Sequence, residues 1–264
     1  MISGFKALHK FIKDSKPKRV ALVAAEDPVL IQAAIRAQQE GLAHFILFGN
    51  SRKIESLIPP GITGFEIIDS QQPALDAIQH IHAGNADLLM KGKIQTGDLL
   101  RAILDKDTGL RQGELLNHIA VIESPHYHKL LFVSDGGINL HLDEHVFQQM
   151  VGNITQYLKL LGLDRPHFGM MALVETVSDK IPETVIARNV VKHLSKTVSI
   201  EGPIAPDVAL SREAAQKKGL NSKISGEIDV FLMPNTTAAN HLVKGLSALG
   251  GRKVGGVMVG DSVP

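Results

Sequence analysis

Cysteine is absent from the 264 residues of this chain. Without thiols there can be no disulfide framework, no cysteine-ligated metal and no cysteine nucleophile. No stretch approaches the roughly 20 consecutive apolar residues that a membrane-spanning helix needs. Residues 1–16 alternate apolar and basic residues and lack the apolar run and cleavage site of a secretory signal. The sequence therefore predicts a soluble cytoplasmic protein that does not act on a membrane.

An excess of one charge is lacking as well. The chain has 28 Lys and Arg residues against 27 Asp and Glu residues, which gives a formal net charge of +1. This balance offers no electrostatic footprint for nucleic acid or an anionic membrane, so any anion-binding site must be local. Hydrophobic residues make up 44% of the chain, enough to bury a core in one large α/β domain or two modest ones.

Short apolar runs alternate with helical patterns in the first part of the chain. Asp27 and Pro28 are typical of an N-cap and a first helical residue. We expect strands at 19–25, 43–48, 64–68 and 86–90, and helices at 27–40, 73–82 and 96–104. This alternation predicts a parallel sheet that is covered on both faces.

The second half begins with two apolar runs within 119–135 that predict a hairpin, followed by a long amphipathic helix at 143–161. Alternation then resumes, with strands expected at 168–174, 198–201, 229–233 and 254–259 and helices at 183–194, 212–218 and 238–249. The Gly136–Gly137 pair is a candidate hinge. We therefore predict an α/β fold of two α/β domains, with residues 1–137 and 257–264 in the first and 138–256 in the second.

The segment 91–101 is the most informative for function, because it follows a strand and opens a helix. A helix N-terminus offers unpaired N–H groups and a partial positive charge to an anion. The alternative is an ordinary helix in which Asp98 and Arg101 form an ion pair at i, i+3. Five residues could serve an anion site here: Lys91, Gly92, Lys93, Thr96 and Arg101.

A second candidate site follows the hairpin, where Asp135, two glycines and Asn139 end a strand. Asn235 ends a later strand, and Asn240 falls in the helix that follows it. A turn, a cap and a solvent-facing amide are the structural alternatives. His126 and His128 would face one side of a strand, but no third ligand stands at a suggestive spacing. Neither HExxH nor a dinucleotide fingerprint occurs, so we expect no metal and no nicotinamide cofactor.

Four segments together resemble successive motifs of the phosphate acetyl/butyryltransferase family, and most closely its butyryl branch. They are LLMKGKIQTGDLLRAIL (88–104), PHYHKLLFVSDGGIN (125–139), EGPIAPDVALS (201–211) and MPNTTAANHLVKGL (233–246). The resemblance implies an isocitrate/isopropylmalate dehydrogenase-like fold, with two α/β domains flanking a cleft, and a homodimer. It implies an acyltransferase that moves a short acyl group, butyryl or similar, between coenzyme A (CoA) and inorganic phosphate.

The resemblance also implies direct transfer in a ternary complex, with CoA as a substrate and no permanently bound cofactor. Carried over by motif, the residues expected to contact phosphate or CoA are Gly92, Thr96 and Arg101, with Lys91 and Lys93 as weaker choices. Asn139, Asn235 and Asn240 are expected to line the cleft. The absence of cysteine agrees with a route that forms no acyl-enzyme.

One departure concerns the catalytic residues, which we leave unassigned. The family's Ser-Arg pair falls beyond Pro264, and Ser211-Arg212 is a Ser-Arg in the other domain. We expect the sequence to be truncated there. Two alternatives stay open: an acyl-carrier-protein:phosphate acyltransferase, which would need a basic docking face, and a non-catalytic CoA- or phosphate-binding protein. A metal-dependent hydroxyacid dehydrogenase would need a cluster of Asp residues that we do not find.

Overall fold

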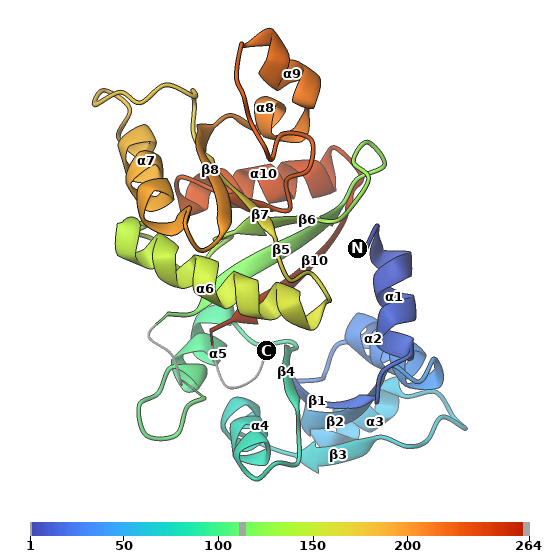
Figure 1. Ribbon diagram of the computed structural model, residues 1–264. Coiled ribbons are helices and arrows are strands. Elements are labelled where there is room, and N and C mark those ends of the chain that lie inside the picture. The colour runs from blue at the N-terminus through green and yellow to red at the C-terminus, as the bar shows by residue number, and fades with distance from the viewer. Residues whose placement is uncertain (1, 111–114, 261–264) are drawn as a thin grey trace. The chain divides into compact units, whose positions relative to one another are not determined.

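The computed structural model describes residues 2–110 and 115–260, and these form two compact α/β units (Figure 1). The first, here called the 8–110 unit, consists of residues 8–110. The second, the 115–260 unit, consists of residues 115–260 together with residues 2–7. Helix α1 (Phe5–Lys13) begins in the residues of one unit and ends in those of the other.

The 8–110 unit is built on a sheet of four strands in the order β3-β2-β1-β4. All pairings are parallel, as the alternation of apolar runs and helical patterns predicted. The strands are β1 (Lys18–Val23), β2 (Ala43–Gly49), β3 (Glu66–Asp69) and β4 (Leu88–Lys91), and the helices are α2 (Pro28–Gln39), α3 (Ser51–Leu57), α4 (Pro73–His82) and α5 (Thr96–Ile103).

Asp27 caps α2 as expected. Its side chain accepts hydrogen bonds from the backbone N–H groups of Val29 and Leu30, and Pro28 is the first helical residue. Ile31 and Ala34 of α2 then pack on Leu22 and other apolar side chains of the sheet. Alternating strands and helices thus bury the apolar residues of β1 and β2.

The 115–260 unit has a sheet of six strands in the order β10-β5-β6-β9-β7-β8. Strands β6, β9, β7 and β8 run parallel, whereas β5 runs antiparallel to both β6 and β10, so the predicted hairpin is confirmed. The strands are β5 (Asn117–Glu123), β6 (Leu131–Ser134), β7 (His167–Met171), β8 (Ser199–Ile204), β9 (Val230–Leu232) and β10 (Lys253–Val259), and the helices are α6 (Glu144–Leu160), α7 (Pro182–Leu194), α8 (Pro206–Leu210), α9 (Arg212–Lys217) and α10 (Thr236–Ala248).

The division between the units differs from the predicted boundary at residue 137. Because β5 and β6 hydrogen-bond into the same sheet as β9, the residues from 117 onward belong to the 115–260 unit, and Gly136 and Gly137 follow a strand inside it. Residues 257–260 do not return to the first unit either. All of β10 pairs with β5, from Lys253 opposite Glu123 to Val259 opposite Asn117. The two separate sheets agree with the expected two-part α/β architecture.

Within the described residues, no helix is both long and apolar enough to cross a membrane. The same residues contain no group of three or more His, Asp or Glu side chains that could hold a metal ion.

Candidate functional site

The 91–101 segment lies at the point of the 8–110 unit where the strand order reverses. From β1 the chain builds outward through β2 to β3, and it then crosses back to place β4 on the other side of β1. In open α/β sheets, ligands bind at such a switch point, outside the carboxyl ends of the strands. The two strand ends are joined there, since the Lys93 N–H donates to the Ala24 carbonyl oxygen at 2.7 Å.

Gly92 makes this close approach possible. A Cβ atom at position 92 would lie 2.2 Å from the Val23 carbonyl oxygen and 2.4 Å from that of Ala24. Both are backbone atoms and cannot turn aside as a side chain could. A glycine is therefore required where the loop after β4 passes the end of β1, and the close approach is to the backbone of β1. The expected approach of Gly92 to an anion stays a prediction.

Helix α5 starts directly after this loop. Its N-cap residue, Gln95, makes no side-chain hydrogen bond to the first turn, and Thr96 is the first helical residue. The positive end of the helix dipole and the Lys91 and Lys93 side chains add favourable charge for an anion. The segment therefore combines a tight glycine turn, a helix N-terminus without a side-chain cap and two cations.

Arg101 adopts the structural alternative. Its Nη1 atom lies 2.8 Å from Asp98 Oδ1, and the Arg101 side chain is 78% exposed. An exposed pair of this kind is worth only about 0–1 kcal/mol. Arg101 is therefore paired with Asp98, and this competing ion pair is weak.

In the 115–260 unit, the second candidate site forms where the parallel neighbours β6 and β9 end. Asp135 follows β6 and is fully buried. Its carboxylate accepts backbone hydrogen bonds from Gly137 at 2.8 Å, Ile138 at 3.0 Å and Asn139 at 3.1 Å. Backbone donors of this number stabilise a buried carboxylate and hold the turn in one conformation.

The three predicted asparagines lie at this turn and at the start of α10. We call these two segments together the strand-end cluster. Asn139 Nδ2 donates to the Leu116 carbonyl oxygen at 2.8 Å, and Asn240 Nδ2 donates to the Gly136 carbonyl oxygen at 3.0 Å. Asn235 Oδ1 caps α10 by accepting the Ala238 N–H at 2.8 Å. These amide groups bind protein atoms, so they shape the cluster and hold its backbone groups in place.

His118 also belongs to the strand-end cluster, although no sequence motif marked it as a site residue. Its carbonyl oxygen accepts a hydrogen bond from Ser134 Oγ at 2.8 Å, and its imidazole lies against Gly136. Burial lowers the pKa of His118 below its ordinary value, although the nearby Asp135 charge acts in the opposite direction. Its glycine neighbours, Gly136 and Gly256, could be recognised only once the strands were paired.

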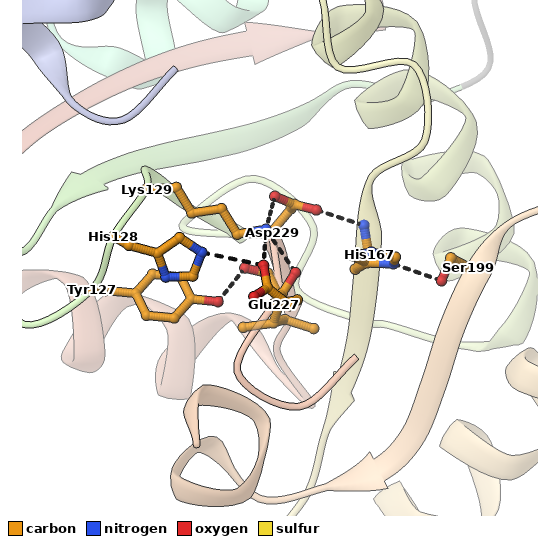
Figure 2. A network of polar contacts seen from close by, with 8 residues as sticks. Tyr127, His128, Lys129, His167, Ser199, Glu227 and Asp229 are labelled. Carbon is orange, nitrogen blue, oxygen red and sulfur yellow. Dashed lines mark hydrogen bonds and ion pairs between the residues drawn. The ribbon is translucent and has the colours of Figure 1, made fainter. Parts of the chain in front are cut away.

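A further polar network lies at the opposite end of these strands (Figure 2). Lys129 Nζ is 2.7 Å from Asp229 Oδ1, and both side chains are at most 3% exposed. Lys129 also donates to the Glu227 carbonyl oxygen at 2.7 Å, while Asp229 Oδ2 accepts the His167 N–H at 2.8 Å. These bonds join the starts of β6, β7 and β9, so this network serves the fold.

Two further motifs have structural roles. His128 contacts Glu227 at 3.2 Å, so the predicted spacing of His126 and His128 does not form part of a metal cluster in the described residues. Ser211 Oγ accepts the Ala214 N–H at 3.1 Å and thereby caps α9, which Arg212 begins.

The comparison with known proteins decides the family. The protein-family model described as "Phosphate acetyl/butaryl transferase" matches residues 65–264 of the sequence. The chain belongs to this family. The phosphate butyryltransferase of Clostridium acetobutylicum is 33% identical over 274 residues, which cover 100% of this chain and 91% of that protein. The phosphate acetyltransferase of Thermotoga maritima is 34% identical, over 94% of this chain and 88% of that protein.

Solved structures give the same family and fold. A branched-chain phosphotransacylase from Enterococcus faecalis V583 superposes with a TM-score of 0.84 at 28% identity, covering 94% of this chain and 90% of that one. A 4-hydroxythreonine-4-phosphate dehydrogenase from Burkholderia phymatum superposes with a TM-score of 0.59 at 13% identity over 94% and 88% of the two chains. This second likeness concerns the fold alone. The predicted family and the predicted dehydrogenase-like α/β fold are thus both confirmed.

Proposed function

We propose that this member of the family is an acyltransferase that moves a short acyl group between CoA and inorganic phosphate. The observation that carries the proposal is the position of the 91–101 segment. A loop that only glycine can form leads into a helix N-terminus at the switch point of a parallel sheet. Both substrates carry phosphate groups, and this is the chemistry that such a site binds.

The binding residues follow from the same segment. Because the Arg101–Asp98 pair is exposed and weak, a phosphate group can compete with Asp98 for the guanidinium. Asn139, Asn235 and Asn240 act through the strand-end cluster, whose backbone groups they hold. The residues proposed to contact phosphate or CoA are Lys91, Gly92, Lys93, Thr96 and Arg101.

Transfer is proposed to be direct, within a ternary complex. A phosphate oxygen attacks the thioester carbonyl, a C–O bond forms, the C–S bond breaks, and CoA leaves as a thiolate that takes up a proton. The chain has no cysteine, so no acyl-cysteine can form. Holding both reactants in attack geometry can supply roughly 7–11 kcal/mol of the barrier. The proposal assigns binding residues and leaves the catalytic residues unassigned.

The finer parts of the proposal are a butyryl or similar acyl group, CoA as a substrate with no permanently bound cofactor, a homodimer and a cytoplasmic location. The butyryl assignment is supported by the likeness to the Clostridium acetobutylicum protein. The likeness to the Thermotoga maritima acetyltransferase supports an acetyl group instead. An apolar pocket distinguishes two acyl groups that differ by one methylene by only ~1–3 kcal/mol. Comparing kcat/KM for acetyl-, butyryl- and isobutyryl-CoA decides among these acyl groups.

The test is phosphate-dependent release of CoA from butyryl-CoA, followed with a thiol reagent. Because the protein contains no cysteine, it contributes no thiol signal of its own. We expect release to rise with phosphate and to stop when phosphate is omitted. Phosphate-independent release would identify a thioesterase instead. If the protein binds CoA but releases none from butyryl-CoA, the non-catalytic CoA- or phosphate-binding alternative is favoured. Activity on an acyl-carrier protein alone would favour the acyl-carrier-protein:phosphate acyltransferase.

A further inference from the structure

His118 occupies a defined place at the end of the sheet in the 115–260 unit. It lies on β5, where it pairs with Met258 of β10. On the other side of β5, Ala120 pairs with Val133 of β6, and the Ser134 hydroxyl at the end of β6 donates to the His118 carbonyl oxygen at 2.8 Å. His118 therefore stands between β10 and the strand-end cluster.

Two glycines that are far apart in sequence make room for its ring. A Cβ atom at Gly136 would lie 2.6 Å from His118 Nδ1, and a Cβ atom at Gly256 would lie 2.6 Å from His118 Nε2. Any side chain at either position would push the ring toward the other. The imidazole is thus seated between the turn after β6 and strand β10, with one nitrogen toward each.

The hydrogen bonding of the ring is incomplete. His118 Nδ1 is buried and has no hydrogen-bond partner among the described residues. Asp135 cannot supply one as an acceptor without losing contacts, since its two oxygens already serve the backbone of the turn and the Asn139 amide. A buried polar atom left without a partner is costly and calls for an explanation. Burial also lowers the pKa of His118, while the nearby Asp135 charge acts in the opposite direction.

The His118 ring lies next to Gly136, whose backbone carbonyl group has a defined hydrogen-bond partner. Gly136, which faces Nδ1, presents its carbonyl oxygen to Asn240 Nδ2 at 3.0 Å. Moving the ring would move Gly136 and with it the hydrogen bond to α10. The neighbouring Gly137 has open space around it, so the constraint acts on Gly136 alone of this pair.

We propose that His118 is a positioning residue for acyl transfer: its imidazole, seated between Gly136 and Gly256, fixes the Asp135 turn and the Asn240 amide in the arrangement that the reaction uses. This inference rests on the proposed function. It assigns a role in the reaction to a residue outside the 91–101 segment that is proposed to bind phosphate. Loss of the ring should therefore lower kcat and leave the KM for phosphate unchanged.

The test is a double-mutant cycle of His118→Ala and Gly136→Ala in the complete chain, with Gly137→Ala as the matched control. Each single variant should lower kcat by about tenfold to hundredfold, the effect of misplacing groups near the chemistry by about 1 Å. The phosphate KM should stay within about twofold of wild type, since uniform binding is unaffected. In the double variant, the new methyl group at position 136 enters space that the ring has left. Gly136→Ala should then have no further effect, and Gly137→Ala should behave as wild type.

The same cycle is measured by urea unfolding, which separates the possible outcomes. Coupling in both kcat and the urea midpoint supports the proposal. Coupling in the midpoint alone would make His118 a structural residue and overturn it, as would additive losses in kcat or a rise in phosphate KM. If the wild-type chain shows no acyl transfer at all, the proposed function fails instead, while the midpoints still show whether the ring is seated as described. His118→Asn keeps a polar atom near the Nδ1 position. If His118 positions groups for the reaction, this variant should recover part of the kcat that His118→Ala loses. If His118 is only structural, it should recover none.

Discussion

Replacing Gly92 with alanine perturbs the proposed anion loop at its tightest point. The new Cβ atom would lie 2.2 Å from the Val23 carbonyl oxygen, and contacts below 3.0 Å essentially never occur. The loop must therefore move by at least 0.8 Å away from the end of β1. That movement stretches the 2.7 Å hydrogen bond from Lys93 N–H to the Ala24 carbonyl oxygen.

The expected loss follows from these two terms. Overpacking against rigid backbone costs about 1–3 kcal/mol, and the lost hydrogen bond adds about 1 kcal/mol. We therefore expect Gly92→Ala to reduce the free energy of unfolding by about 2–4 kcal/mol. A displacement near 1 Å at a binding loop should lower kcat/KM by up to about 100-fold.

Gly97→Ala is the matched control, because it makes the same chemical change five residues further on in α5. A Cβ atom at Gly97 meets nothing within 4 Å. Alanine in a helix is favoured over glycine by about 0.5–1 kcal/mol, so this variant should be slightly more stable than wild type.

Urea unfolding and phosphate-dependent CoA release measure both variants at matched folded concentration. Wild-type stability and kcat/KM in Gly92→Ala would refute the argument that this loop requires a glycine. Equal damage in Gly92→Ala and Gly97→Ala would show that the effect does not arise from the contact with β1.

Three further predictions concern single side chains. Arg101→Ala should raise the KM for phosphate or CoA, and Arg101→Lys should restore it only in part, because lysine lacks the planar fork. Lys129→Met leaves the Asp229 carboxylate buried without its partner and should cost about 3–5 kcal/mol in urea unfolding. The Arg19 side chain lowers the pKa of Asp87 from 3.8 to about 2. Asp87 therefore stabilises the fold above about pH 4, and this contribution is lost as the pH falls toward 2. In Asp87→Asn, the urea midpoint should fall less steeply over this acid range.

Each of these three predictions has a control variant or a result that would contradict it. Lys217→Met removes an ion pair that is 74% exposed and should change stability by less than about 1 kcal/mol, in contrast to Lys129→Met. Wild-type kinetics in a folded Arg101→Ala variant would leave Arg101 only its contact with Asp98. An unchanged acid limb in Asp87→Asn would show that Asp87 makes no net contribution to acid stability.

Local sequence patterns were sufficient to predict most elements of the fold. The apolar runs of β1 and β2 and the Asp27-Pro28 signal of α2 are properties of a few neighbouring residues, and the structure has them where they were expected. The boundary at residue 137 could not be found in this way. It depends on the pairing of β6 with β9, from Phe132 opposite Val230 to Ser134 opposite Leu232, and no local pattern specifies such a distant partner. Gly136, one of the two glycines that suggested a hinge, leaves space for the His118 ring.

The candidate site shows the same limit. Gly92 and Thr96 were predicted from a motif that is contiguous in sequence, and their positions follow from the strand–loop–helix order. The choice of Arg101 between an anion and Asp98 depends on a side-chain conformation that the motif does not determine. His118 became a candidate only once strand pairing placed it between Gly136 and Gly256. Residues defined by contacts between distant segments require the structure.

The most direct test of the proposed function is to identify the product by phosphorus NMR after mixing the protein with butyryl-CoA and inorganic phosphate. Direct acyl transfer predicts a new acyl phosphate signal that grows in step with the release of CoA, one molecule for each. Release of CoA with free butyrate as the product, and no acyl phosphate signal, would contradict it.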